Sequence, residues 1–198
     1  MTDLLDVFTK SATKPTVVCD IDNTLAWTLN VTLVMVNASY HTNFTLKDID
    51  AYHFEANLPL EESMWIKQQY SLPITYANVP PDYHAIDAIN TIYDRGYHVT
   101  IATSRATKML TVTRDWLNEW GVKYHELLVG PTVKVDYAKE HSNLFVIDDD
   151  PATALNLAPY GAEVWIPERT YTPSWCRSSS MSGVQVFTDW STVVDRLA

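Results

Sequence analysis

The 198 residues of the chain, 46% of them apolar and 12% aromatic, are enough to bury one substantial core and to carry one further subdomain of modest size. The formal net charge of −10 comes from 24 acidic and 14 basic residues, and it argues against extended nucleic-acid binding through non-specific attraction to phosphates. A small anionic ligand stays compatible with this charge, because a metal ion and a few local cations can outweigh the overall field.

The N-terminal sequence does not have the pattern of a secretion signal. MTDLLDVFTKSATKP lacks a basic segment and a long apolar run, and no stretch approaches the ~20 apolar residues that span a bilayer. Cys19 and Cys176 lie far apart in the sequence and do not indicate a disulfide framework. We therefore expect a cytoplasmic protein that makes no membrane contact. The sequence leaves its oligomeric state open, a homodimer included.

Strands and helices alternate along most of the chain. Residues 16–20 (TVVCD) are a short β-branched and apolar run, typical of a central parallel strand. Residues 82–95 carry apolar side chains at helical spacing before Gly96, and residues 98–103 (HVTIAT) again have the pattern of a buried strand. The expected later elements are helices over 108–120, 135–141 and 152–157 and strands over 126–129, 143–147 and, last, 163–166. This alternation predicts a three-layer α/β/α, Rossmann-like domain around a parallel sheet.

Residues 26–81 interrupt this rhythm. The stretch is polar, aromatic and helix-leaning, and it lies between the first strand and the helix that should pack beside it. We expect residues 1–25 and 82–198 to form the α/β core and residues 26–81 to form a small inserted helical subdomain, called the cap segment below. The serine-rich stretch after Thr170 is expected to be a loop, followed by the apolar run VQVF and a short final helix.

Acidic and hydroxyl side chains follow three of the predicted strands. In an open α/β sheet, ligands bind beyond the carboxyl ends of the strands. The first strand ends in DIDNT from Asp20, the second in TSR from Thr103, and a later one in the run DDD from Asp148. Clustered carboxylates repel one another and generally need a cation, and hard oxygen ligands suit Mg²⁺. Asp20, Asp148 and Asp149 are therefore the candidate metal ligands.

Two carboxylates at one strand end can divide the work of phosphoryl transfer. With Mg²⁺ neutralising the charge on a phosphoryl group, one of them can attack phosphorus and form an acyl phosphate. The other must protonate the leaving oxygen and later activate water. Asp20 and Asp22 provide such a pair.

These residues resemble the motifs of the haloacid dehalogenase superfamily. DIDNTL resembles its first motif, D-x-D-x-T/V, ATS at 102–104 resembles the second, and VIDDDP resembles the fourth, a strand that ends in paired aspartates. The third motif is a lysine ahead of that strand. KVDYAKEH offers Lys134, which is the preferred candidate, and Lys139 as the alternative.

The resemblance implies a role for each matched residue. Asp20 would be the nucleophile, and Asp22 the acid and base, with its backbone carbonyl on Mg²⁺. Thr103 would hydrogen-bond the phosphoryl oxygens, and Lys134 would supply a counter-charge. The paired aspartates of the fourth motif would hold the metal. An aspartate at position 22 also favours phosphoryl transfer over dehalogenation, which needs no such acid.

Within the superfamily, the chain most resembles the 5'(3')-deoxyribonucleotidases, over roughly residues 16–190. The pieces that carry this resemblance are the Phe54 region, SMWIKQQY around Trp65, the TPSW stretch and the IDD-x-P pattern that ends in Pro151. In that family, aromatic side chains of the cap stack on the base. The resemblance therefore implies Trp27, Phe54 and Trp65 as base contacts, although such rings would equally fill the core of a small subdomain.

The residues near the phosphate position offer further contacts and two departures from the pattern. Ser104 and Arg105 follow the second motif and are candidate substrate contacts. Asp150 stands where the nucleotidases usually carry arginine, and it could instead cap a helix. Asn23 replaces the common glycine after the second aspartate. Both departures bear on the substrate more than on the reaction.

The expected activity is Mg²⁺-dependent hydrolysis of a small phosphomonoester, with a (deoxy)ribonucleoside monophosphate as the expected substrate. A polynucleotide 3'-phosphatase would share the motifs, but the acidic composition and a closed cap disfavour it. A sugar-phosphate or phosphoprotein phosphatase is a further alternative. The non-enzymatic alternative is a nucleotide-binding scaffold without turnover, which the complete catalytic set argues against.

Overall fold

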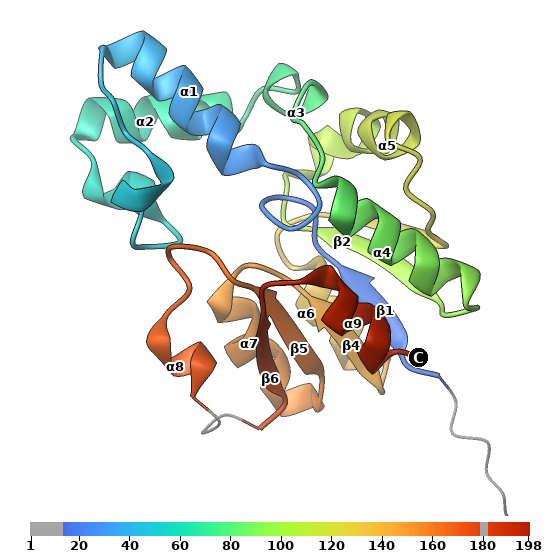
Figure 1. Ribbon diagram of the computed structural model, residues 1–198. Helices are drawn as coiled ribbons and strands as arrows, with labels where there is room; N and C mark the ends of the chain where they lie inside the picture. The colour runs from blue at the N-terminus through green and yellow to red at the C-terminus, as the bar shows by residue number, and fades with distance from the viewer. Residues whose placement is uncertain (1–13, 179–181) are drawn as a thin grey trace, which may run out of the picture.

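The computed structural model describes residues 14–178 and 182–198, and its centre is a parallel sheet with helices on both faces (Figure 1). The described strands are β1 (Thr16–Cys19), β2 (Val99–Thr103), β3 (Glu126–Val129), β4 (Leu144–Ile147), β5 (Glu163–Pro167) and β6 (Val184–Phe187). They form a six-stranded sheet in the order β3-β2-β1-β4-β5-β6, and every neighbouring pair is parallel. The predicted α/β/α fold is confirmed.

Each face of the sheet has its own buried apolar layer. One face packs against α4 (Tyr83–Asp94), α5 (Leu110–Glu119) and α9 (Trp190–Arg196), and the other against α6 (Val133–Glu140), α7 (Pro151–Leu157) and α8 (Ser174–Arg177). Successive side chains of β1 point to opposite layers, so Val17 and Cys19 lie in the first and Val18 in the second. Burial on both faces explains why these strands are continuous apolar runs in the sequence.

The C-terminal part differs from the prediction in two places. The strand over 163–166 is not the last, because β6 pairs in parallel with β5 at the edge of the sheet. The four apolar residues VQVF had no periodic context long enough to identify them as a strand. α8 interrupts the stretch expected to be a loop, since Cys176 is buried against the sheet. Residues 179–181, the serine-rich remainder, lie outside the described residues.

The cap segment contains helices only. They are α1 (Thr28–Tyr40), the 3₁₀ turns η1 (Leu46–Asp48) and η2 (Phe54–Asn57), α2 (Leu60–Gln69) and α3 (Ile74–Ala77). α1 and α2 lie apart from the sheet in Figure 1 and share a small apolar cluster that includes Leu33, Val36 and Ile66. Two further 3₁₀ turns, η3 (Thr107–Met109) and η4 (Ala158–Tyr160), lie in the rest of the chain. The division into core and cap stays a prediction.

Two further observations concern the cysteines and possible membrane-spanning helices. Cys19 in β1 and Cys176 in α8 are both buried free thiols. Within the described ranges, no helix combines the length and the apolar character that crossing a bilayer requires.

Candidate active site

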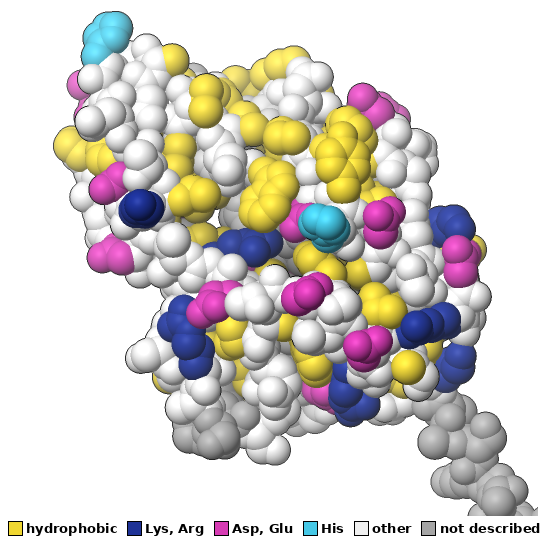
Figure 2. Space-filling model, viewed as in Figure 1, with side chains coloured by type: hydrophobic (Ala, Val, Ile, Leu, Met, Phe, Trp, Pro, Cys, Tyr) yellow, Lys and Arg dark blue, Asp and Glu magenta, His cyan; other side chains and the backbone are white. Residues whose placement is uncertain are grey.

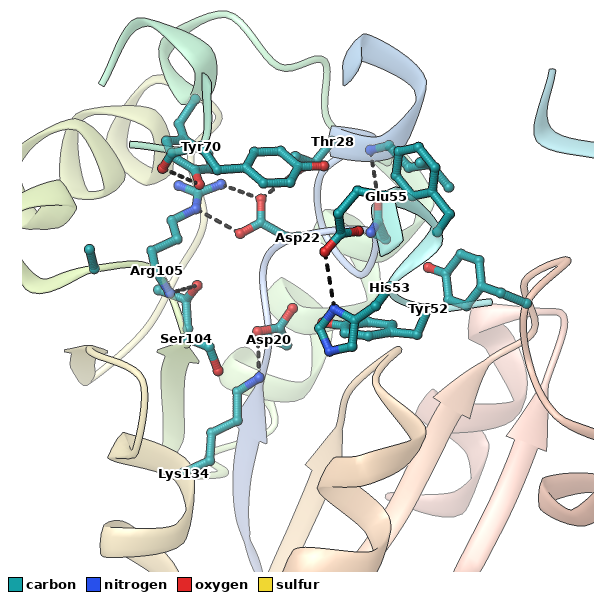
Figure 3. Close-up of a pocket in the computed structure, with 17 residues that line it drawn as sticks. Asp20, Asp22, Thr28, Tyr52, His53, Glu55, Tyr70, Ser104, Arg105 and Lys134 are labelled. Carbon is teal, nitrogen blue, oxygen red and sulfur yellow. Dashed lines mark hydrogen bonds and ion pairs between the residues drawn. The ribbon is translucent and has the colours of Figure 1, made fainter. Parts of the chain in front are cut away.

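The carboxyl ends of β1 and β2 open into a cavity of about 330 Å³ that the cap segment covers from the other side (Figure 3). Asp20 and Asp22 line it directly after β1, and Thr103, Ser104 and Arg105 line it at the end of β2. Lys134 reaches the same space from α6. The structure thus brings together residues from three of the four sequence motifs around one cavity.

Lys134 joins two buried aspartates. Its Nζ donates to Oδ1 of Asp20 at 2.6 Å and to Oδ2 of Asp148 at 2.5 Å. Burial disfavours the charge on the amine, but Asp148 and Asp20 outweigh this and hold the pKa of Lys134 above its ordinary value. Lys134 therefore stays a cation. The alternative lysine, Lys139, instead pairs with Asp136 on the exposed side of α6.

Asp20, Asp148 and Asp149 form a cluster that fits a divalent cation. Each offers a carboxylate oxygen, and these atoms lie within 4.8 Å of one another. Burial raises the pKa of Asp20 well above its ordinary value, and burial together with the charge of Asp148 raises the pKa of Asp149 to about 7. Three carboxylates this close together are the donor set that a hard cation such as Mg²⁺ would satisfy.

Asp149 is oriented by its own hydrogen bonds. The Tyr171 hydroxyl donates to Oδ2 at 2.6 Å, and the Thr24 hydroxyl donates to Oδ1 at 3.4 Å. Asp150, the third aspartate of the run, points elsewhere and accepts a hydrogen bond from the Ala152 N–H at the start of α7. The helix-capping interpretation of Asp150 thus matches its contact in the structure.

Asp22 is held by a two-pronged ion pair. Arg105 donates from Nε to Oδ2 and from Nη2 to Oδ1, both at 2.8 Å, and the Thr28 hydroxyl donates to Oδ1 at 2.5 Å. Burial would raise the pKa of Asp22, but the Arg105 guanidinium outweighs it and holds that pKa below its ordinary value. The Asp22 carboxylate is therefore ionised and fixed in orientation.

Arg105 has little freedom for other partners. The side chain is 1% exposed, its remaining nitrogen Nη1 donates to the Thr113 hydroxyl at 3.2 Å, and its guanidinium lies 4.1 Å above the centre of the Tyr76 ring. In this structure, the cation expected to contact substrate contacts Asp22 instead. Thr103 supports the same turn, since its hydroxyl accepts the Arg105 N–H at 3.3 Å, whereas Ser104 is exposed to the cavity.

The turn that follows Asp22 has an unusual backbone at Asn23. Its φ is +55°, a left-handed conformation that glycine adopts freely and that asparagine tolerates better than most residues. The Asn23 side chain accepts the Leu29 N–H at 2.7 Å, and its carbonyl accepts two hydrogen bonds from Arg169, at 2.9 and 2.7 Å. Arg169 was missed in the sequence analysis, although its place just after β5 could have indicated it.

The cap side of the cavity is aromatic. Phe54, one of the three rings singled out from the sequence, lines it together with Tyr52, Tyr70 and Tyr76. The three tyrosines were not identified from the sequence, because they come together only when η2, α2 and α3 fold against the core. Nothing in their local sequence separates them from the other aromatic residues of the cap segment.

The two tryptophans predicted to contact a base lie elsewhere. Trp27 lines a neighbouring cavity of about 220 Å³, where the Arg169 guanidinium lies 4.9 Å from its ring centre. Trp65 packs edge-to-face against Tyr40 in the apolar cluster of the cap segment, with 5.9 Å between ring centres. Neither tryptophan is among the residues that line the cavity above Asp20.

Several solved structures of similar shape are described as hydrolases or phosphatases. A haloacid dehalogenase-like family hydrolase from Streptococcus pneumoniae aligns with a TM-score of 0.68 at 11% identity, over 93% of this chain and 99% of that chain. A protein described as a predicted phosphoglycolate phosphatase from Haemophilus somnus aligns with a TM-score of 0.63 at 13% identity, over 93% and 98%. D,D-heptose 1,7-bisphosphate phosphatase from Burkholderia thailandensis gives 0.57 at 12% identity, over 93% and 99%.

The comparisons by sequence add no relative. No protein-family model matches the chain, and a search of curated proteins finds no match. Structural likeness at 11–13% identity establishes the fold and leaves the chemistry to be argued from the site. The order and parallel pairing of the strands, together with these alignments, show that the chain has the fold of haloacid dehalogenase-like hydrolases.

Proposed function

We propose that the protein is a Mg²⁺-dependent phosphatase that hydrolyses phosphomonoesters through an aspartyl phosphate on Asp20. One observation carries this proposal: Asp20 and Asp22 line one cavity, and Asp20 also belongs to a cluster of three buried carboxylates. Lys134 bridges two of the three, those of Asp20 and Asp148. A nucleophile, a separate acid and base, and a cation site are thereby available around a single phosphoryl position.

The reaction divides between the two aspartates. An Asp20 oxygen attacks phosphorus, and the bond from phosphorus to the leaving oxygen breaks. Because Asp22 is ionised beside Arg105, it must first take up a proton, which a monoanionic phosphomonoester can bring, and it then passes that proton to the leaving oxygen. Water then attacks the phosphorus of the aspartyl phosphate, Asp22 takes the proton, and Asp20 is regenerated as phosphate leaves. The ion pair with Arg105 favours the ionised Asp22 that this second step requires.

The cation would be held by Asp20, Asp148 and Asp149, with the backbone carbonyl of Asp22 as a further ligand. Bound Mg²⁺ would neutralise negative charge on the phosphoryl group and orient it toward Asp20. The four aspartates of the site carry two more charges than Lys134 and Arg105 when all are ionised, so a divalent cation would restore the balance that an incoming phosphate needs.

For the substrate, we propose a (deoxy)ribonucleoside monophosphate. The cavity volume of about 330 Å³ lies at the lower end of the range for small-molecule sites, roughly 300–1,000 Å³, and its cap side offers flat rings for a base. Figure 2 shows lysines and arginines scattered among acidic side chains, and the described residues on that face form no continuous basic stripe. These features support a single nucleotide over an extended strand.

The test measures phosphate release from ribo- and deoxyribonucleoside monophosphates, sugar phosphates and a 3'-phosphorylated oligonucleotide, with Mg²⁺ and with EDTA. Asp20→Asn should lower turnover by about 10³-fold or more, because the nucleophile is lost. Protein quenched during turnover of ³²P-labelled substrate should carry label in the wild type and none in Asp20→Asn. Asp136→Asn, an exposed aspartate of α6, is the matched control. Undiminished turnover by Asp20→Asn would refute the mechanism.

A further inference from the structure

Most polar atoms on the cap side of the cavity already have protein partners. The Tyr70 hydroxyl lies 3.0 Å from the Thr32 hydroxyl, and the Tyr76 hydroxyl donates to the Tyr70 carbonyl at 3.0 Å. Thr28 is used by Asp22. These groups shape the cavity, and they are not free to recognise a leaving group without giving up a bond.

Glu55 is the exception among the charged groups of the cap side. It lies in η2, lines the cavity, and has a side chain that is only 15% exposed. Its contact in the described part of the chain is with Nδ1 of His53, at 3.5 Å from Oε1, which is longer than a normal hydrogen bond. His53 itself is 75% exposed. Figure 3 shows the contact between the Glu55 and His53 side chains as a dashed line.

A carboxylate in this position needs hydrogen-bond donors from whatever fills the cavity. An ionised carboxylate only accepts hydrogen bonds, so a ligand that displaces water from the partly buried Glu55 must bring donors in its place. The neighbouring walls are the rings of Tyr52, Phe54 and Tyr70, which favour a flat partner. The site therefore combines a surface for stacking with an acceptor at its edge.

We infer that Glu55 selects the leaving group by accepting hydrogen bonds from the edge of a nucleobase, and that guanine fits it best. This inference rests on the proposed function and extends it to the base. Guanine presents two adjacent donors, N1–H and the N2 amino group, which a carboxylate can accept side by side. The single N3–H of thymine lies between two carbonyl oxygens, which Glu55 repels. Adenine and cytosine offer one amino group beside an acceptor nitrogen.

The experiment compares kcat/KM for the deoxyribonucleoside 5'-monophosphates of guanine, hypoxanthine, adenine, cytosine and thymine in Mg²⁺. We expect guanine to exceed thymine by roughly 10-fold, the scale of one two-pronged base contact. Hypoxanthine, which lacks the 2-amino group, should fall between them. Glu55→Gln, which turns one acceptor into a donor, should bring the guanine-to-thymine ratio close to one. Glu61→Gln, an exposed residue of the same segment, should leave the ratio unchanged.

The outcomes separate this inference from the proposed function. Nucleotide turnover with a base ranking that Glu55→Gln does not alter overturns the role of Glu55 and leaves the phosphatase proposal in place. Hydrolysis of p-nitrophenyl phosphate without hydrolysis of any nucleotide overturns the proposed substrate and the base selection together. Inhibition of p-nitrophenyl phosphate hydrolysis by guanosine but not by thymidine, lost in Glu55→Gln, supports the contact through a readout that needs no nucleotide turnover.

Discussion

On the sheet side of the cavity, charged side chains hold one another in short contacts. Lys134 joins Asp20 to Asp148, and Arg105 grips Asp22. On the cap side, the walls are aromatic rings, and within residues 14–178 and 182–198 the Glu55 carboxylate has only a long contact with an exposed histidine. The difference indicates that the sheet side is arranged before a substrate arrives, whereas the cap side keeps an acceptor available. Under the proposed function, the reaction and the selectivity would be carried by different walls of the cavity.

The largest effect is expected from replacing Lys134, which lies on the sheet side of the cavity. Lys134→Met leaves two buried carboxylates without their cation, and breaking a buried pair of this kind costs about 3–5 kcal/mol. Urea unfolding without Mg²⁺ should report this as a lower midpoint. Lys139→Met in the same helix removes an exposed ion pair and should leave the midpoint nearly unchanged. Equal midpoints for the two variants would mean that the sheet side is not held as described.

A smaller effect is expected from filling the carboxylate cluster. Mg²⁺ at 100 times its dissociation constant should stabilise the folded protein by about 2.7 kcal/mol, which corresponds to a rise in Tm of roughly 5 °C or more. Asp149→Asn should reduce this rise, because it removes one of the three clustered carboxylates. Asp150→Asn is the matched control, since Asp150 caps α7 outside the cluster and asparagine caps helices as well. A rise that Asp149→Asn leaves intact would contradict the metal assignment.

The smallest effect concerns the aromatic wall of the cap side. Phe54→Leu should raise KM for a nucleotide about fivefold, the scale of one lost ring contact of about 1 kcal/mol. Trp65→Leu should leave KM unchanged, because Trp65 packs against Tyr40 away from the cavity. Steady-state kinetics at saturating Mg²⁺ provides the measurement. A larger rise in KM for Trp65→Leu would return that residue to the role that the family resemblance implies.

The sheet side was predictable from the sequence for a local reason. Parallel strands deliver the residues that follow them to one edge, so Asp20, Thr103 and Asp148 could be placed near one another from strand patterns alone. The helix over 82–95 and the buried strands were predictable for the same reason, since both faces of the sheet are covered. β6 escaped prediction because four apolar residues carry too little periodicity to separate a strand from a loop.

The cap side was less predictable because its geometry is made by packing between segments. Tyr52 precedes η2, Tyr70 follows α2 and Tyr76 lies in α3, and the three side chains meet only around the cavity. Trp27 and Trp65 belong to the same aromatic composition but lie outside it. The ion pair between Arg105 and Asp22 was equally hard to predict, because the two residues are 83 positions apart in the sequence. Composition indicated that rings would be present, but not which ones would face the ligand.

Asn23 has a consequence for the energetics of binding. A glycine at this position would leave the turn after Asp22 many conformations in the unfolded chain and more freedom in the folded one. Asparagine reduces the number of conformations in the unfolded chain. In the folded chain, its side-chain hydrogen bond from the Leu29 N–H and the two hydrogen bonds from Arg169 restrict the movement of the turn. The conformational entropy of this turn is therefore lost during folding and not during substrate binding. Binding energy from the substrate is left to favour the reactive geometry instead of arranging the turn.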